Sequence, residues 1–580
     1  MTNTTSKRLE PFQTSKLAGF QFGDPDAKVD ELLPNCPQTI RGVREFLGGS
    51  KNIVLGERGS GKSALFRLVT EGKYKFAELS DKPRKQLIVA IDEDLDYVTI
   101  SNVIEGRFVD KTKRPHGKYR FLWEIHVISR VIDRLADEYG FEKEIQTLQE
   151  DFSEILGMSK EKKFCLSDLL TSYKLTTGIK IDQAGSVSPT VSVEPAKDAQ
   201  THAVEVTDHQ ITLFRDRVRK AIRARRAVVY VLVDKIDDFV VELAYEEQKK
   251  SVQALLECTQ AFRFPELKLK IFLRIDLFKR LDFEKGGYDK ISPQVVRLEW
   301  TADDIFEFVA RRLLFNYERQ EIKMPSWGVS TALLEVDPLV VEKVRELVAT
   351  RPNGMGELLK RIGKGLVLIS KMKWSQFWKE SRSERKTNSL DAVLFNVVNF
   401  IYPTKVLHLN SGCKREEILF KTFLADHFKL GGVCPNPRLV LLFLHYTFEE
   451  AVAYYDRNSD SACRLLEPND IGEYELILKE HILRGFRKLQ VTARETVTQL
   501  SLQWRHPIDR LLAGLVSPKQ CTGLTVGTLK KLTDWKEDDQ AFHRFIAFYS
   551  HVGLLVPENE SAQFEDRRFS LPLVMRICPS

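Results

Sequence analysis

The chain has 580 residues, more than one hydrophobic core usually supports, so about two to four domains are expected. Its composition, 43% hydrophobic and 29% charged, is ordinary for a globular protein, and the formal net charge of +7 permits nucleic-acid binding without arguing for it. Because no apolar run reaches about 18 residues and no signal-peptide core occurs, we expect a cytoplasmic protein without a membrane partner. The cysteines lack a C-x2-C pair and the histidines lack metal-ligand spacing, which argues against zinc and against disulfides.

Residues 1–45 are expected to form a lead-in, after which strand-like and helix-like runs alternate to about residue 300. Continuous runs of apolar, β-branched residues are typical of a parallel sheet that is buried on both faces. Residues 121–135 carry an apolar stripe at helical spacing. The alternation therefore predicts an α/β core over residues 46–300. Its expected strands are residues 53–55, 86–92, 227–233 and 267–273.

A glycine-rich segment joins the first expected strand to the helix that follows it. It is Gly56-Glu57-Arg58-Gly59-Ser60-Gly61-Lys62-Ser63, and the order strand, Gly-x4-Gly-Lys-Ser, helix is the P-loop arrangement. The glycines let backbone N–H groups curl around phosphate oxygens, and the helix directs its positive end at the same oxygens. We assign nucleotide binding to these eight residues and to Ala64. Lys62 would neutralise the β- and γ-phosphates, and the Ser63 hydroxyl would ligate Mg²⁺.

Two segments before the third expected strand have alternative interpretations. Residues 175–208 alternate like strands around a Gly/Ser/Pro turn, so we expect either an inserted β-hairpin or a mobile loop there. Residues 215–226 are the densest positive run in the chain. We interpret this run as a solvated helix packed on the sheet, and contact with nucleic acid or a partner is the alternative.

The third expected strand runs directly into Asp234-Lys-Ile-Asp-Asp238. A carboxylate at the tip of a buried strand beside the P-loop is where Mg²⁺ needs a ligand, and we assign that role to Asp234. A further carboxylate is needed to orient and deprotonate the attacking water, and Asp237 or Asp238 follows about one turn later.

The sequence becomes helical after Trp300. We expect a helical lid over residues 301–390, and residues 391–500 are predicted to be helical throughout, with a buried segment at 439–444. Near the C-terminus, a helix at 541–552 that ends at Gly553 is followed by two short strand-like runs, which predicts a winged helix within the region 391–580. This module carries few cations, so protein packing is at least as good an interpretation as DNA reading.

Several motifs together resemble a known family. They are Phe22-Gly23-Asp24-Pro25-Asp26-Ala27, Gly59-Ser-Gly-Lys-Ser-Ala-Leu65, Asp234-Lys-Ile-Asp-Asp238, Phe272-Leu-Arg-Ile-Asp-Leu-Phe278 and Leu298-Glu-Trp300. In this order they resemble prokaryotic P-loop ATPases of the STAND/KAP side of the AAA+-like class, over about residues 15–370. The departure is Asp238, where glutamate is usual, and it bears on the hydrolysis rate more than on binding.

The resemblance implies further site residues. Arg274 falls at the sensor position, where a cation detects the γ-phosphate. This position is on the strand next to the one that ends at Asp234, which is the Walker B strand of the family. Arg311 and Arg312 are candidates for an arginine finger that acts on a neighbouring subunit. A lid sensor motif is implied around residues 351–361.

The fold class expected from these patterns is a P-loop, AAA+-like parallel sheet followed by a helical lid and a C-terminal helical and winged-helix region. The function expected is a Mg-ATPase that acts as a nucleotide-controlled switch or assembly platform, as a homo-oligomer or with a protein effector. The resemblance also implies a role in antiphage defence. The alternative is a DNA-binding loader or initiator of origin-recognition-like organisation. Because no ABC signature and no separate guanine-reading Asn-Lys-x-Asp motif occur, ATP is the expected nucleotide.

Overall fold

The structure is a computed structural model that describes most of the chain in separate stretches. These are residues 12–77, 84–92, 117–155, 173–181, 187–195, 208–236, 245–279, 281, 287–322, 390–409, 415–430, 434–457, 465–466, 476–499, 504–515, 518–536, 538–559 and 563–576. The chain divides into two compact units. We call Glu45–Gly56 together with Lys62–Leu298 the sheet unit, and Met1–Arg44, Glu57–Gly61 and Glu299–Ser580 the helical unit.

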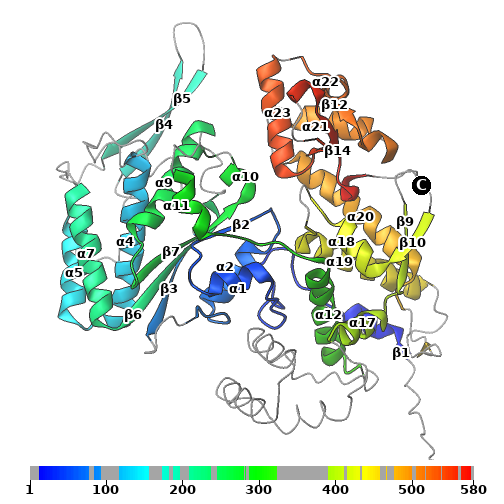
Figure 1. The fold of residues 1–580 in the computed structure, drawn as a ribbon, viewed down its shortest axis with the longest axis horizontal. Helices are drawn as coiled ribbons and strands as arrows, with labels where there is room; N and C mark the ends of the chain where they lie inside the picture. The colour runs from blue at the N-terminus through cyan, green and yellow to red at the C-terminus, as the bar shows by residue number, and fades with distance from the viewer. Residues whose placement is uncertain are drawn as a thin grey trace, which may run out of the picture. The chain divides into compact units, whose positions relative to one another are not determined.

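The sheet unit is built on five parallel strands in the order β3-β6-β7-β2-β8. Strands β2, β3, β6 and β7 are labelled in Figure 1. Four of the five strands match the predicted ones, and β8 was not predicted. Because the strand that precedes the P-loop lies between β7 and β8, with β6 beyond β7, the order is that of an AAA+-like P-loop sheet. The expected α/β fold class is therefore confirmed. The strands are β2 (Ile53–Gly56), β3 (Lys85–Ile91), β6 (Ala227–Val233), β7 (Leu267–Arg274) and β8 (Val295–Arg297).

Helices cover both faces of the sheet. Alternate strand residues such as Leu55, Val231 and Ile271 share one core with α4, α7 and α9, and α5 packs against α4 and α7. On the other face, Phe272 contacts both Phe46 of α1 and Phe66 of α2. The helices are α1 (Arg41–Leu47), α2 (Lys62–Thr70), α4 (Gly117–Tyr139), α5 (Lys143–Ile155), α7 (Asp208–Ala224), α9 (Tyr245–Ala261), α10 (Ile275–Lys279) and α11 (Gly287–Ile291).

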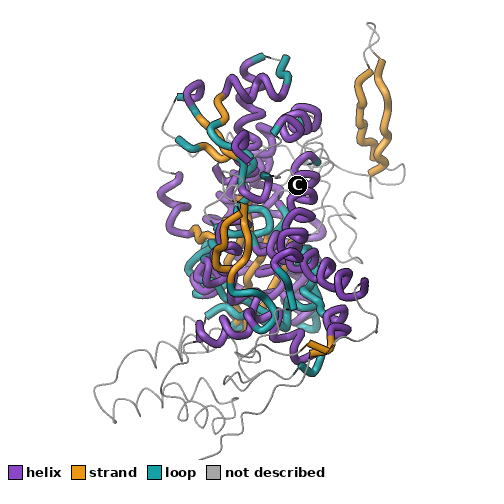
Figure 2. The backbone as a smooth tube through the Cα atoms, turned by 90° about the vertical axis from the view of Figure 1, so that its right-hand side faces the viewer, coloured by secondary structure: helices purple, strands orange, loops and turns teal. Residues whose placement is uncertain are grey.

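A two-stranded hairpin is inserted between β3 and β6 in the sequence. Strands β4 (Tyr173–Ile181) and β5 (Val187–Pro195) pair antiparallel, with Tyr173 opposite Pro195 and Ile181 opposite Val187. Figure 2 shows the two strands as an orange pair. Of the two alternatives for this segment, the structure contains the hairpin.

The basic run at 215–226 lies on α7 and at its end, and five of its arginines are ion-paired inside the sheet unit. Arg217, for example, lies 2.6 Å from Asp151. This pairing supports the interpretation as a packed helix, because arginines that are ion-paired with carboxylates are less available to bind the phosphate groups of a nucleic acid. The other pairs are Arg215–Glu124, Arg219–Glu266, Arg223–Glu266 and Arg225 with Glu142 and Glu144.

A lysine is buried beside the sheet. Lys270 of β7 has no exposed surface, and its ammonium donates to the carbonyl of Gly49 at 3.1 Å and to that of Lys51. The ammonium also lies 5.3 Å from the ring centroid of Phe46 and 5.2 Å from that of Phe76. Burial, with a smaller effect of the Lys268 charge, lowers the pKa of Lys270 to about 7.

This pKa predicts a pH-dependent stability. Between the folded pKa of about 7 and the ordinary value of 10.5, the unfolded chain binds the proton at Lys270 and the folded chain does not. The contribution of Lys270 to the free energy of unfolding is therefore lowest near pH 7 and below, and rises by about 1.4 kcal/mol per pH unit above it. In urea titrations between pH 7 and 9, the free energy of unfolding of Lys270→Met should lack this part of the increase with pH, whereas that of Lys51→Met should retain it. Equal slopes in Lys270→Met and the wild type would contradict the assignment.

The helical unit contains a hairpin that the sequence analysis missed. Strands β9 (Lys405–Leu409) and β10 (Arg415–Leu419) pair antiparallel, so the expectation that residues 391–500 are helical throughout was wrong. Strands this short give too few residues for an alternating pattern to stand out from a helical one. The expected buried segment at 439–444 lies in α19 and is largely buried. The helices of this unit before residue 500 are α12 (Ala302–Arg319), α17 (Leu390–Asn399), α18 (Phe420–His427), α19 (Pro437–Arg457) and α20 (Lys479–Thr498).

The C-terminal residues form the winged helix that the sequence predicted. Three helices are interleaved with a small antiparallel sheet in the order β12-β14-β13, and α23 ends at Gly553 in a left-handed conformation with φ of 87°. Glycine adopts this conformation without steric cost, which ends the helix. The elements are α21 (Arg505–Gly514), β12 (Leu524–Thr525), α22 (Val526–Thr533), α23 (Asp539–Val552), β13 (Val556–Pro557) and β14 (Arg568–Ser570).

The lead-in is packed into the helical unit by aromatic side chains. The strand β1 (Phe12–Gln13) and a 3-10 turn, Thr14–Gly19, come first, and Phe20 then stacks on Phe448 of α19 with ring centroids 5.2 Å apart. The ring of Phe22 meets that of Phe448 at 4.6 Å. On α12, the Asn316 amide donates to the carbonyl of Gln21 at 2.6 Å and accepts from the N–H of Gln21 at 2.7 Å.

A buried ion pair lies next to these rings. Arg312 of α12 is 1% exposed and its guanidinium lies 2.7 Å from the carboxylate of Asp30, which is itself buried. Arg312 also donates to the carbonyl of Phe22. Gly23, with φ of +84°, passes so close that a Cβ there would collide with both the guanidinium and the carboxylate. Because Arg312 is enclosed and paired, it is not available as an arginine finger for a neighbouring subunit, and that expectation was wrong.

No helix in the described stretches is long and apolar enough to cross a membrane.

Candidate nucleotide site

The sequence-predicted site residues of the sheet unit gather at one edge of the sheet. In the register, Gly56 at the end of β2 is opposite Arg274 at the end of β7, and β7 pairs on its other side with β6, which Asp234 follows. Lys62 and Ser63 begin α2, immediately after the loop that follows β2. Since ligands of open α/β sheets bind outside the carboxyl ends of the strands, this edge is the candidate site.

The P-loop turns at two glycines in left-handed conformations, a kind of turn that lets backbone N–H groups face an anion. Gly59 and Gly61 have φ of +80° and +93°, values that side chains disfavour, so the two glycines are needed for this turn. The N–H of Ser60 donates to the carbonyl of Glu57 at 3.2 Å, which closes the loop locally. Arg58 is exposed to solvent, and Ala64 continues the first turn of α2.

Two polar side chains of the P-loop are buried. The ammonium of Lys62 lies 3.0 Å from the carbonyl of Gly56, and only 9% of this lysine is exposed. Ser60 is 6% exposed, and its hydroxyl has no hydrogen-bond partner within the described part of the chain. Burying a hydroxyl without a partner is costly, and a phosphate oxygen bound in the loop is one acceptor that would satisfy it. The loop therefore fits a phosphate group.

Asp234 occupies the position expected of a metal-binding carboxylate. It is 3% exposed, and its N–H donates to the carbonyl of Ile91 at 2.9 Å, which fixes it at the end of β6. The next residue, Lys235, has φ of +58° and reaches the carbonyl of Asp92 at 3.4 Å. Asp92 follows β3, the neighbour of β6, and the sequence analysis placed it at the end of the expected strand 86–92 without a role.

Arg274 is held by a carboxylate that the sequence analysis did not assign. Its guanidinium donates two hydrogen bonds to Asp276, at 2.9 and 2.7 Å. The side chain of Arg274 is 18% exposed and that of Asp276 is 5% exposed. Such a two-bond pair fixes the direction of the guanidinium. The placement of Arg274 between the P-loop strand and β6 suits a sensor, and that role stays a prediction.

Some expected site residues are outside the described residues or belong to the helical unit. Asp237 and Asp238, and the sensor motif around 351–361, are outside the described residues. Arg311 pairs with Glu307 on its own helix at 2.7 Å, and its role as an arginine finger stays a prediction. Within the described residues, no group of three or more His, Cys, Asp or Glu side chains is placed to hold a metal ion.

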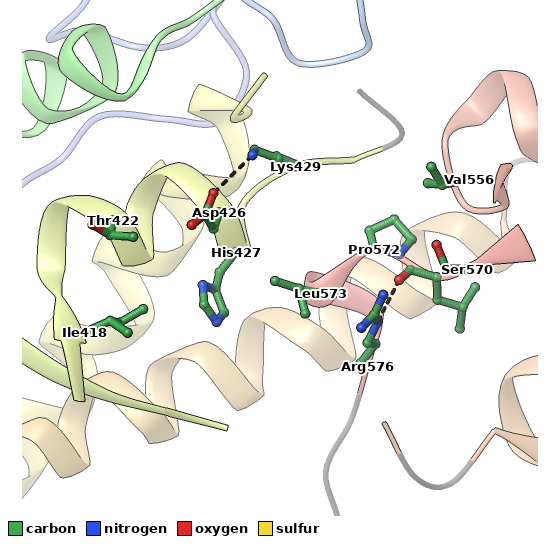
Figure 3. Close-up of a pocket in the computed structure, with 11 residues that line it drawn as sticks. Ile418, Thr422, Asp426, His427, Lys429, Val556, Ser570, Pro572, Leu573 and Arg576 are labelled. Atoms are coloured by element: carbon green, nitrogen blue, oxygen red, sulfur yellow. Dashed lines mark hydrogen bonds and ion pairs between the residues drawn. The ribbon is translucent and has the colours of Figure 1, made fainter. Parts of the chain in front are cut away.

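A separate cavity of about 450 Å³ lies in the helical unit, between α18 and the C-terminal residues 570–576 (Figure 3). Two of its charged groups are already engaged. Asp426 lies 3.1 Å from the ammonium of Lys429, and the guanidinium of Arg576 donates to the carbonyl of Leu571 at 2.7 Å. Because both partners of each contact come from the cavity wall, we assign no ligand to this cavity.

Comparison with known proteins gives one curated relative. No family model matches the chain. The "Putative transposon gamma-delta 80.3 kDa protein" of Escherichia coli (strain K12) is 24% identical over 302 residues, which is 50% of this chain. The match spans 39% of the length of that protein.

Two solved structures of Aeropyrum pernix proteins are similar to nearly the full chain. The ORC1 protein in complex with DNA is 10% identical with a TM-score of 0.32, and 95% of this chain and 93% of that chain are covered. The ORC2 protein, in ADPNP-ADP complexes, is 9% identical with a TM-score of 0.24, and the coverage is 92% and 91%. Similarity this low carries no argument about function, so the fold assignment rests on the strand order itself.

Proposed function

We propose that the protein binds ATP and hydrolyses it as a nucleotide-controlled switch. The observation that carries this proposal is the P-loop, in which two glycines at positive φ precede a buried lysine at the start of α2. Backbone N–H groups in this conformation, together with the positive end of a helix, form an anion site for phosphates. The nucleotide assigned is ATP because the sequence contains no separate guanine-reading motif.

Mg²⁺ fits the oxygen ligands available at this edge of the sheet. The ion prefers hard oxygen ligands and commonly takes only one or two from the protein, with the rest from phosphates and water. The Ser63 hydroxyl and the buried carboxylate of Asp234 are the groups that would hold it. When bound, the ion supplies positive charge to the phosphate oxygens. Asp237 and Asp238 are the groups proposed to orient and deprotonate the water.

The switch would work through differential binding. A nucleotide shifts a conformational equilibrium only as far as its affinities for the two states differ. Arg274, placed between the strand of the P-loop and that of Asp234, is the proposed detector of the γ-phosphate. A homo-oligomer or an effector protein as the responding partner, and a role in antiphage defence, rest on the sequence resemblance alone. The alternative of a DNA-binding loader stays a prediction from the sequence.

Carboxylate substitutions should separate binding from turnover. Asp234→Asn should weaken Mg²⁺-dependent ATP binding, because the amide keeps the size of the side chain and removes its charge. Asp237→Asn or Asp238→Asn should keep binding, and the variant that lacks the base should lose about 10²–10⁴-fold in turnover. Calorimetry with and without Mg²⁺ and a steady-state phosphate-release assay measure the two effects.

The matched control is Asp151→Asn, which changes a carboxylate of the same unit that pairs with Arg217. It should leave binding and turnover unchanged. If both Asp237→Asn and Asp238→Asn hydrolyse ATP at the normal rate, the base lies elsewhere. If Asp234→Asn binds Mg-ATP as tightly as the wild type, the assignment of the metal ligand is wrong.

A further inference from the structure

Two side chains of the helical unit donate hydrogen bonds to carbonyl groups of the P-loop. The amide of Asn436 donates to the carbonyl of Arg58 at 2.6 Å, and the indole N–H of Trp300 donates to the carbonyl of Ser60 at 2.8 Å. All four residues belong to the helical unit, because the segment Glu57–Gly61 is part of it. The sequence separation between Asn436 and Arg58 is 378 residues, so no local pattern in the sequence reveals the contact.

These two bonds determine where the amide groups of the loop point. In a planar trans peptide, the C=O of one residue and the N–H of the next point in opposite directions, and the structure contains no cis peptide in its described residues. When the carbonyl of Arg58 faces Asn436, the N–H of Gly59 faces away from it. By the same geometry, the N–H of Gly61 faces away from Trp300. Each glycine N–H is thus directed away from the side chain that holds the preceding carbonyl.

Asn436 is itself held in place. Its own N–H donates to the carbonyl of Phe428 at 2.8 Å, and its side-chain oxygen accepts from the N–H of Arg438 at 3.0 Å. The second bond is typical of a residue that caps the N-terminus of a helix, here α19. A Cβ on Gly59 would lie 2.7 Å from this oxygen, so the loop and the asparagine are in close contact.

Trp300 is also fixed by its surroundings. It is 8% exposed, and its ring lies edge-on to Phe308 of α12 at a centroid distance of 5.6 Å. The nearest atom to a Cβ built on Gly61 is the ring carbon Cζ2 of Trp300, at 3.8 Å. The indole therefore packs against the loop as well as donating to it.

We propose that Asn436 and Trp300 are positioning residues that hold the N–H groups of Gly59 and Gly61 toward the phosphates of the bound nucleotide. The inference rests on the proposed function. Because Asn436 caps α19, the same contact links the conformation of the P-loop to the start of that helix. A loop whose peptides are already oriented loses less conformational freedom on binding than one that must be ordered by the ligand.

The test is the affinity of the full-length protein for ATP and ADP, measured by calorimetry on variants that remove one donor each. Asn436→Ser keeps a helix-capping oxygen without a charge, and its hydroxyl is too short to reach the carbonyl of Arg58. Trp300→Phe keeps an aromatic ring and loses the N–H. Each variant should lower the affinity for ATP and for ADP by the same factor, about tenfold or more. This is the effect expected when one charge-assisted hydrogen bond between a glycine N–H and a phosphate is disturbed.

The control is Tyr446→Phe, which removes a bond between α19 and Thr492 without touching the P-loop. It should bind ATP normally, and melting temperatures without nucleotide show whether each variant is folded. The inference is overturned if Asn436→Ser and Trp300→Phe both bind ATP as the wild type does, or if Tyr446→Phe loses as much affinity as they do. The proposed function fails separately, if the wild type itself does not bind ATP.

Discussion

Lys62→Ala should abolish measurable ATP binding. The ammonium of Lys62 is buried against the carbonyl of Gly56, at the start of α2, where the β- and γ-phosphates are expected. Charge-assisted hydrogen bonds to phosphate contribute about 1.5–3 kcal/mol each, so losing two of them would weaken binding by about 10²-fold or more. Calorimetry at nucleotide concentrations well above the wild-type Kd measures the loss.

The matched control is Arg67→Ala on the same helix. Arg67 pairs with Glu71 four residues later at 2.6 Å, in a partly exposed contact. Its removal should leave ATP affinity unchanged, because pairs of this kind contribute only about a few tenths of a kcal/mol and this one lies away from the start of the helix. Near-native affinity in Lys62→Ala would disprove the assignment of the phosphate site.

Arg312→Ala should cost about 3–5 kcal/mol of unfolding free energy, the typical effect of removing one member of a buried ion pair. The carboxylate of Asp30 would keep the hydrogen bond from the N–H of Leu32. It would remain enclosed beside Phe22 and Gly23 without a countercharge from the guanidinium, and the carbonyl of Phe22 would lose the Arg312 donor. Urea-induced unfolding measures the change.

The neighbouring Arg311→Ala is the control. Arg311 forms a half-buried ion pair with Glu307, which precedes it by one turn on the same helix. Losing this ion pair should cost about 1 kcal/mol or less. Replacing both members of the buried pair, as in Arg312→Met with Asp30→Leu, should be far less costly than Arg312→Ala alone, because no uncompensated charge remains. Equal stabilities of Arg312→Ala and Arg311→Ala would show that the pair is not the stabilising contact.

The elements that the sequence predicted well are those with a strong local signal. The strands β2 and β6 are apolar runs, β7 alternates apolar residues with Lys268 and Lys270 before its apolar end, and the P-loop is a contiguous motif. β8 has three residues and β9 and β10 have five each, so their patterns are too short to separate from helix or loop.

The contacts that surround the candidate site could not be predicted, for a different reason. Asn436 reaches Arg58, and Arg312 reaches Asp30, across hundreds of residues of sequence. Only the fold brings such residues together, so the sequence alone made Arg312 a candidate for an arginine finger, and its burial excludes that role. Asp276 is an intermediate case, since the Arg-x-Asp spacing was visible but did not reveal the two-bond pair with Arg274.

The packing of the lead-in has a practical consequence for protein engineering. Shortened versions of the chain that begin after about residue 30 would lack the only described carboxylate within hydrogen-bonding distance of the Arg312 guanidinium. They would also lack Phe20 and Phe22, and so expose the ring of Phe448. Expression trials should therefore keep the segment from Phe12 onward, and affinity tags belong before it. Substitutions at Gly23 should be poorly tolerated, because even the Cβ of an alanine would have to displace the ion pair of Arg312 and Asp30.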